Sequence, residues 1–170
     1  STVGDAIAPT LTSSAPADNA VSVARNANVT LTFSEDVAPD SGYISIYKSD
    51  GTLFEQIAVT DSSRVTFSGN TITLNPINDF AASTGYYVNI SQSAVQDMAS
   101  NHYLGLSTST ALNFTTAANQ APVNTVPSAQ TMLEDASRVF SSANSNLLSV
   151  SDADNTFLTV TLSVTNGTLT

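Results

Sequence analysis

Residues 29–33 read Val-Thr-Leu-Thr-Phe, a stretch in which apolar and polar side chains alternate strictly. Successive side chains of a β-strand point to opposite faces of a sheet, so Val29, Leu31 and Phe33 share one face and the two threonines share the other. The stretch therefore predicts a strand with one buried face. Further runs of the same kind predict the rest of the fold.

The same alternation recurs in short runs that are separated by turn residues. Asp50-Gly51 and Ser68-Gly69-Asn70 stand between neighbouring runs, and such residues tolerate the backbone angles of tight hairpins. Only residues 93–98 have a pattern that could hold a helical turn. Short strands at this spacing predict an all-β fold, a β-sandwich. The apolar residues expected on these strands are Ile44, Ile46, residues 53–59, Val65, Phe67, Ile72, Leu74, Tyr86, Val88, Ile90, Leu112 and Phe114.

Residues 115–123, Thr-Thr-Ala-Ala-Asn-Gln-Ala-Pro-Val, end one alternating run and begin another with small and turn-forming side chains. A similar stretch at residues 5–10 precedes the first run, and an all-β domain of roughly 100 residues fits between the two. The chain therefore reads as part of a tandem array. We expect an N-terminal linker at 1–8, a β-sandwich at 9–117, a linker at 118–122, and the N-terminal part of a second module at 123–170.

The charge balance limits the partners of this chain. Its 170 residues include 14 acidic side chains but only four Lys or Arg, which gives a net charge of −10. Four scattered cations are too few to neutralise a phosphate backbone or an anionic membrane, so neither nucleic acid nor a membrane surface is an expected partner. The sequence has no cysteine, which excludes disulfides and thiolate metal sites. Unbalanced acids in a chain without disulfides favour bound calcium as the stabilising element.

Three motifs follow one another in the first module: Phe33-Ser34-Glu35-Asp36-Val37, then residues 80–88, then Asp97-Met98-Ala99-Ser100-Asn101. In order and spacing they resemble the bacterial Ig-like domains of S-layer proteins and large surface adhesins. The resemblance covers roughly residues 8–117 and implies an Ig-like β-sandwich in which Tyr86 is the tyrosine-corner residue. Ser100 stands where that family usually has glycine.

The region beyond the linker carries a second resemblance. Ala121-Pro122-Val123, Glu134-Asp135 and Ser151-Asp152-Ala153-Asp154 are similar to the start of a bacterial cadherin-like repeat. Such repeats are typical of giant RTX adhesins, and the resemblance implies an incomplete second Ig/cadherin-like β-sandwich. The linker residues Asn119-Gln120 lack the aspartates that cadherin linkers use.

Calcium takes several oxygen ligands from flexible loops, and carboxylates at positions i and i+2 of a turn converge on one ion. Asp152 and Asp154 have this spacing, and we expect them at the linker end of the second module, with Asn119 as a linker ligand. Glu134 and Asp135 are candidate ligands at the opposite end of that module. Each of these groups has a simpler alternative, since acidic loop residues are often only solvated or form Asx-type turns.

A second set of candidate ligands belongs to the first module. Strands that run in opposite directions bring the loops after residues 29–33 and 86–90 to the end where the chain begins. Asp18 and Asp79 lie in the opposite loops and could complete a site at the linker. The candidate calcium ligands near the chain's beginning are Asp5, Glu35, Asp36, Asp97 and Asn101.

Catalysis is not expected from this sequence. His102 is the only histidine, no serine-glycine elbow lies near it, and there is no tryptophan to form a sugar platform beside a carboxylate pair. The chain lacks the positioned base or nucleophile that a catalytic triad needs.

The sequence therefore predicts an extracellular, calcium-stabilised spacer or extender module of a large bacterial surface adhesin, which serves cell adhesion and biofilm formation. Its expected partners are neighbouring modules of the same chain, host-cell or biofilm ligands bound through other domains, and a second copy that pairs with residues 157–165. Two alternatives stay open. One is a ligand-binding module for carbohydrate or protein, with Tyr43, Tyr47 and Tyr103 as candidate contacts; the other is a non-catalytic accessory domain of a secreted hydrolase.

Overall fold

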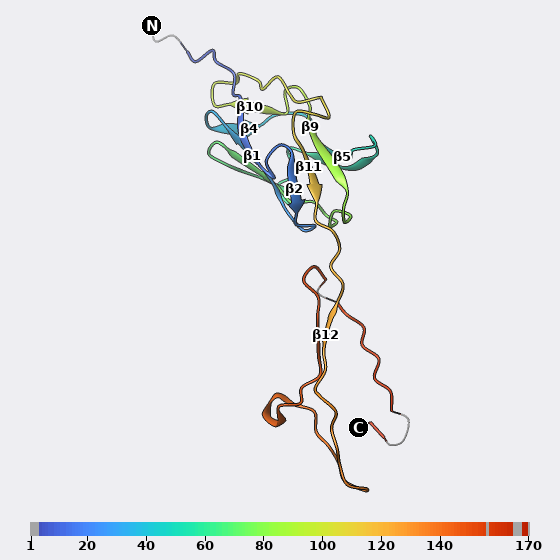
Figure 1. The fold of residues 1–170 in the computed structure, drawn as a ribbon. Helices are drawn as coiled ribbons and strands as arrows, with labels where there is room; N and C mark the ends of the chain where they lie inside the picture. The colour runs from blue at the N-terminus through green and yellow to red at the C-terminus, as the bar shows by residue number, and fades with distance from the viewer. Residues whose placement is uncertain (1–3, 156, 165–167, 170) are drawn as a thin grey trace. The chain divides into compact units, whose positions relative to one another are not determined.

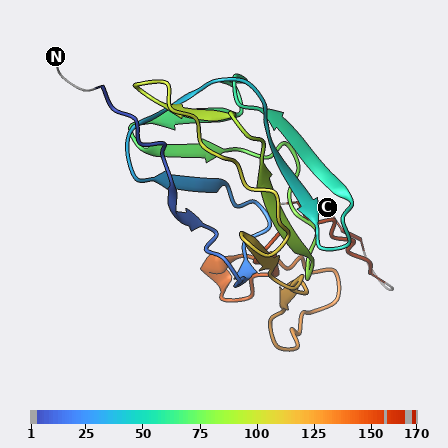
Figure 2. The ribbon, with the colours of Figure 1, turned by 90° about the horizontal axis from the view of Figure 1, so that it is seen from above.

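The computed structural model describes residues 4–155, 157–164 and 168–169. The chain divides between Ala118 and Asn119 into two compact units. In the described residues the regular structure consists of β-strands and one short 3-10 helix, so the predicted all-β class is confirmed. Figures 1 and 2 show the strands of the first unit in two facing layers.

The first layer is a four-stranded sheet in the order β1-β3-β8-β7, and the second is a five-stranded sheet in the order β2-β11-β9-β5-β6. A separate two-stranded pair, β10-β4, lies at one end of the first unit (Figure 1). The strands are β1 (Leu11–Ala15), β2 (Ala20–Val23), β3 (Val29–Phe33), β4 (Val37–Pro39), β5 (Tyr43–Lys48), β6 (Leu53–Ala58), β7 (Val65–Ser68), β8 (Thr71–Leu74), β9 (Gly85–Ile90), β10 (Val95–Asp97) and β11 (Asn113–Thr116).

The alternating run at residues 29–33 forms β3, the second strand of the four-stranded sheet. Its three apolar side chains are buried, while the threonines between them are half-buried. Both predicted hairpins are present: β5 pairs with β6 around Asp50-Gly51, and β7 pairs with β8 around residues 68–70. Gly51 and Gly69 have φ values of +86° and +57°, the left-handed region that favours glycine.

Residues 93–98, the stretch whose pattern could hold a helical turn, form none. Val95–Asp97 form the strand β10, which pairs with β4 in antiparallel register, with Gln96 opposite Ala38. Val95 and Asp97 are buried and Gln96 between them is half-buried, so the local pattern is that of a strand. Three residues are too few for a period of two to be recognised in the sequence.

The core between the two sheets is rich in aromatic rings. Tyr86, Phe80 and Phe114 are each at most 1% exposed, and the ring centroids of Phe80 and Tyr86 lie 4.7 Å apart. The Tyr86 hydroxyl accepts a hydrogen bond of 2.9 Å from the backbone N–H of Ala81. This is the tyrosine corner that the family resemblance implies.

The chain enters and leaves the first unit at opposite ends of β3. Ser34, directly after β3, donates its backbone N–H to the Thr10 carbonyl at 2.9 Å. At the other end, Arg25 precedes β3, and its carbonyl accepts from the N–H of Phe80. The neighbouring Ala81 carbonyl accepts from the hydroxyl of Thr116, the last residue of β11. The first unit therefore carries its two connections at opposite ends, as Figure 1 also shows.

The second unit contains two short strands, β12 (Val123–Thr125) and β13 (Ser149–Ser151), which pair in antiparallel register, and the 3-10 helix η1 (Ser142–Asn144). Most of its large apolar side chains are exposed; Phe157 is 92% exposed, Val160 56% and Leu162 59%. The described residues between 157 and 164 belong to no strand pair. An extended apolar segment whose backbone groups lack ladder partners is a site for pairing with another chain.

We expect the chain to self-associate through this segment as its concentration rises, because pairing would bury the apolar side chains and satisfy the backbone groups. Replacing both Val160 and Leu162 with threonine should weaken the association while keeping the strand propensity. Sedimentation at increasing concentration measures it. The matched control replaces Ile77 and Met98, which are 72% and 77% exposed in the first unit, with threonine. A mass that is independent of concentration, or equal effects of the two double variants, would contradict this expectation.

Candidate metal centre

Three carboxylates meet at the end of the first unit where the chain begins. Asp5 comes from the N-terminal segment, Glu35 from the turn between β3 and β4, and Asp97 from the end of β10. One oxygen of each side chain lies within 4.8 Å of the oxygens of the other two. A search of the described residues for three or more acidic, histidine or cysteine side chains close enough to share a metal ion finds this group. We call it the carboxylate cluster.

The turn after β10 fixes the position of Asp97, which is only 3% exposed. Its Oδ1 accepts hydrogen bonds of 2.8 Å from the backbone N–H groups of Ala99 and Asn101, and its Oδ2 accepts one of 2.7 Å from the Asn101 side-chain amide. Ser100 holds a φ of +69° between them. The sequence Asp-Met-Ala-Ser-Asn thus forms a closed Asx-type loop that fixes the carboxylate.

Hydrogen bonds to residues distant in sequence hold the N-terminal segment beside this loop. Thr10 donates its N–H to the Ser34 hydroxyl at 3.0 Å and accepts from the Ser34 N–H. The Asn101 side-chain amide donates to the Asp5 carbonyl at 3.2 Å. The Asn101 side-chain amide therefore contacts two members of the cluster, namely the backbone carbonyl of Asp5 and the side-chain carboxylate of Asp97. Asp5 also accepts from the N–H of Ile7 at 3.0 Å.

Burial and neighbouring negative charge together raise the pKa of Glu35. The largest cause is burial, followed by the charges of Asp5 and Asp97, and a hydrogen bond from the Ser34 side chain acts in the opposite direction. For Asp97, burial is again the largest single influence and raises the pKa, but the hydrogen bonds from Asn101 and Ala99 together hold the pKa below its ordinary value. Asp97 is therefore the fixed anion of the cluster, and a nearby cation would offset the charges that raise the pKa of Glu35.

The ion pairs given by the described residues do not neutralise the carboxylate cluster. In the described part of the chain, the ion pairs are Arg64 with Glu55 and His102 with Asp40, and neither involves Asp5, Glu35 or Asp97. Three carboxylates that converge without a basic side chain are the donor set that Ca²⁺ prefers, since it takes six to eight oxygen ligands in flexible geometry. The residues present thus fit a hard divalent cation.

The other candidates from the first unit lie elsewhere. Asp36 is exposed and outside the cluster; its Oδ1 lies against Gly69 in the β7–β8 turn. Asp18 caps β11, because its Oδ1 accepts from both the backbone and the side-chain N–H groups of Asn113 at 3.0 Å. Asp79 is exposed in the loop before Phe80. Sequence reasoning missed Ser34, whose place directly after β3 and opposite Thr10 becomes visible only once β1 is paired with β3.

In the second unit, Asp152 and Asp154 form one turn. The Asp152 Oδ1 accepts from the N–H groups of Asp154 and Asn155 at 3.0 Å each, and the Asp154 Oδ2 accepts from the N–H of Gln120 at 3.0 Å. Asn119 donates its side-chain amide to the Gln120 carbonyl. The turn therefore contacts the linker residues, as expected, but Asx-type hydrogen bonding accounts for Asp152. Glu134 and Asp135 are exposed in the loop before η1 and join no three-member group among the described residues.

The three candidate contact tyrosines have different environments. Tyr103 is 8% exposed and packs edge-to-face on Phe33 at 5.3 Å, and burial raises its pKa. It is therefore a core residue, and its assignment as a ligand contact was wrong. Tyr43 is 49% exposed, and Tyr47 stacks on Tyr87. Both lie on β5, on the outer face of the five-stranded sheet.

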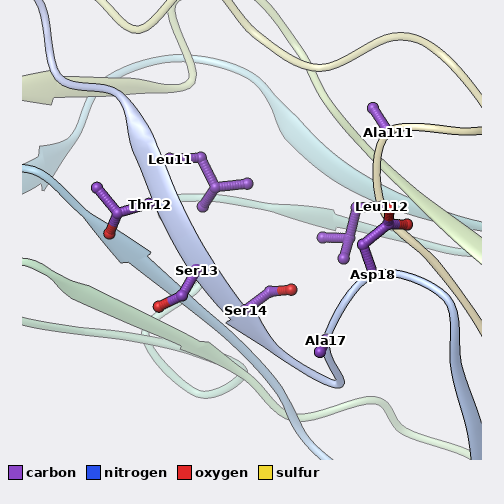
Figure 3. A pocket seen from close by; sticks show the side chains of 8 residues that line it. All are labelled: Leu11, Thr12, Ser13, Ser14, Ala17, Asp18, Ala111 and Leu112. Atoms are coloured by element: carbon purple, nitrogen blue, oxygen red, sulfur yellow. The ribbon is translucent and has the colours of Figure 1, made fainter.

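A pocket of about 320 Å³ lies between β1, the β1–β2 turn and the segment before β11 (Figure 3). Leu11 and Leu112 supply apolar surface, and Thr12 and Ser14 supply hydroxyl groups. Its one titratable side chain, Asp18, is bonded to Asn113. No histidine or lysine lines it, so the pocket lacks the paired acid and base that catalysis requires.

Two facing sheets and a tyrosine corner place this chain in the class of Ig-like β-sandwich proteins. More closely, the chain belongs to the bacterial Ig-like domain family, whose model matches residues 5–116. The match begins at Asp5, so the carboxylate cluster lies within it.

The solved structures that are similar to this chain include the following two. CopC from Methylosinus trichosporium OB3b is 19% identical with a TM-score of 0.49, and the match covers 66% of this chain and 97% of that one. The S-layer protein rSbsC(31-844) is 18% identical with a TM-score of 0.42, and the match covers 86% of this chain but 18% of that one. At these values the two similarities carry no information on function. No curated protein sequence matches this chain. Among the described residues, no helix has the length and apolar character needed to cross a membrane.

Glu35→Gln should stabilise the protein at neutral pH in the presence of a chelator. Because the pKa of Glu35 is raised in the folded state, its ionised form destabilises the fold above that pKa, and the penalty disappears below the ordinary glutamate pKa. The gain should therefore be present at neutral pH and lost in acid. Chemical denaturation of the variant and wild type at both pH values measures it. Asp79→Asn, which removes one exposed charge outside the cluster, is the control; equal gains for the two variants would refute a cluster effect.

Ser100→Gly should raise the free energy of unfolding by about 0.5–1 kcal/mol. Glycine removes the steric cost of a left-handed serine, and this gain is larger than the extra conformational entropy that glycine loses on folding. The expected gain follows from the φ of +69°. Ser107→Gly is the matched control, because Ser107 is exposed and is not among the positive-φ residues, so this change should be neutral or destabilising. Thermal melts of both variants decide it; a lower midpoint for Ser100→Gly would show that the loop does not hold this angle in solution.

Proposed function

We propose that this chain is a non-catalytic, extracellular spacer of a large bacterial surface adhesin, stiffened by calcium. The observation that carries the proposal is the carboxylate cluster, which joins the N-terminal segment to the body of the first sandwich. An ion bound there links residues from the segment before β1 to the β3–β4 turn and to β10. Calcium binding thus holds the point at which the chain enters the module.

The placement of the two chain connections supports the same proposal. Since they lie at opposite ends of the first unit, a series of such units extends the distance between whatever precedes and follows them. A spacer needs a stable module and restricted motion where modules connect. Without calcium the carboxylates repel one another. When calcium binds to all of them, it restricts motion of the N-terminal segment relative to the sandwich.

The acidic turn of the second unit extends the proposal. Asp154 accepts a hydrogen bond from Gln120, so calcium at Asp152 and Asp154, with Asn119 beside them, would hold the linker residues against that unit. Glu134 and Asp135 form a further candidate pair in the loop before η1. In the first two cases the ion would bind beside a chain connection, and the expected partners of the chain are its neighbouring modules.

Calcium should raise the unfolding free energy of the full chain by about 2.7 kcal/mol when the free ion is at about 100 times its dissociation constant. Magnesium should do less, because it demands near-octahedral geometry that a cluster from three separate segments supplies poorly. Thermal melts in calcium, in magnesium and in a chelator measure the effect. Glu35→Gln should reduce the calcium increment of the first unit, since it removes one ligand while keeping the side-chain shape.

The double variant Asp152→Asn with Asp154→Asn is the matched control, because it removes two acids from the other unit and should leave the first unit's calcium response intact. Identical midpoints in calcium and in chelator would overturn the calcium proposal. A calcium response that survives Glu35→Gln but is lost in the double variant would place the ion in the second unit and refute the role of the carboxylate cluster.

A further inference from the structure

The outer face of the five-stranded sheet carries a patch that the calcium proposal does not use. The register pairs Ser45 with Asn89 and Tyr47 with Tyr87 between β5 and β9, and pairs Ser45 with Gln56 and Tyr47 with Leu53 between β5 and β6. Ile44 and Ile46, the alternate residues of β5, are fully buried in the core, so these side chains point the other way. We call the patch the tyrosine face. It consists of Tyr43, Ser45, Tyr47, Leu53, Gln56, Tyr87 and Asn89.

Aromatic and apolar surface is exposed on this face. Tyr43 and Leu53 are each 49% exposed. The rings of Tyr47 and Tyr87 are stacked, with centroids 5.2 Å apart and planes 13° from parallel, so their packing fixes both rings. Tyrosine presents an apolar ring together with a hydroxyl group, and rigid rings of this kind lose little conformational entropy when a ligand covers them.

Polar groups lie between the rings. Ser45 is 6% exposed and its hydroxyl accepts a 3.1 Å hydrogen bond from the Gln56 amide. The Oδ1 of Asn89 is buried and has no hydrogen-bond partner within the described protein. Because this oxygen has almost no exposed surface, the amide of the face that a ligand can reach directly is that of Gln56, which is exposed. The face therefore combines flat apolar rings with amide and hydroxyl groups.

No residue of the tyrosine face is charged, although the chain has a net charge of −10. An uncharged face on a strongly acidic protein disfavours anionic polymers, which the rest of the surface repels. A partner without charge does not meet this repulsion.

We propose that the tyrosine face binds a neutral carbohydrate. The C–H faces of a sugar ring pack on tyrosine, and its hydroxyls can donate to and accept from the exposed Gln56 amide. The contact lies on the sheet and not on the end loops, which separates it from the carboxylate cluster. This assigns a second role to a module that also serves as a spacer.

The test is an array of neutral oligosaccharides that also carries acidic ones, probed with the full chain in calcium and in chelator. We expect retention on at least one neutral glycan, none on acidic glycans, and the same result in chelator. Tyr43→Ala should weaken the interaction roughly tenfold, and Gln56→Glu, which adds a charge at nearly constant volume, should weaken it as much. Because Tyr43 is half-exposed, its truncation leaves the core intact.

The matched control is Ile77→Ala, which removes a 72% exposed side chain outside the face and should leave binding unchanged. Tyr47→Ala serves as a second variant, with a thermal melt to confirm folding. The proposal is overturned if no neutral glycan is retained, if acidic glycans are preferred, or if Tyr43→Ala binds like Ile77→Ala. It is also overturned if Tyr43→Ala changes the mass of the chain in solution, since the face would then be an interface between copies.

Discussion

The first unit depends on the packing of aromatic rings around Tyr86. Phe80, Phe114 and Phe54 each lie within 5.7 Å of the Tyr86 ring, centroid to centroid. Phe54 comes from β6, Tyr86 from β9, Phe114 from β11 and Phe80 from the loop before β9, so the contact ties an edge strand, two inner strands and a connection together. Burying each large apolar side chain contributes roughly 1.5–3 kcal/mol, and the Tyr86 hydroxyl adds a hydrogen bond that fixes the loop.

Much of this fold could be predicted from period-two alternation, and the exceptions have physical reasons. β3, β7, β8 and β9 bury alternate residues, so their pattern is visible in the sequence. β10 has three residues and β1 lies at the sheet edge with mostly exposed side chains, which leaves too little contrast to read. In the second unit, the alternate apolar residues Val160, Leu162 and Val164 are exposed and Leu158 is half-buried, which agrees with the expectation of an incomplete second module.

The candidate site was predictable in its membership but not in its detail. Antiparallel topology alone brings Glu35 and Asp97 to the end that holds Asp5, whereas Asp36, one residue further on, turns toward Gly69. A one-residue difference in a turn cannot be resolved from sequence. The unequal roles of the three carboxylates were also hidden, because they depend on which oxygens already accept hydrogen bonds. Asp97 is held by backbone N–H groups, while Glu35 is left with the electrostatic cost.

The pairing of β2 with β11 has a mechanical consequence. These strands lie near the beginning and the end of the first unit, and they run parallel, with Phe114 opposite Ala20 and Thr116 opposite Val23. Tension applied to the two connections pulls such strands past each other along their length, so the hydrogen bonds between them carry the load together instead of opening one after another. Unfolding under force then requires several bonds to break at once. Because β1 precedes β2 in the chain and pairs with β3, tension from the N-terminal side reaches the β2–β11 pair only after it has loaded the β1–β3 pair.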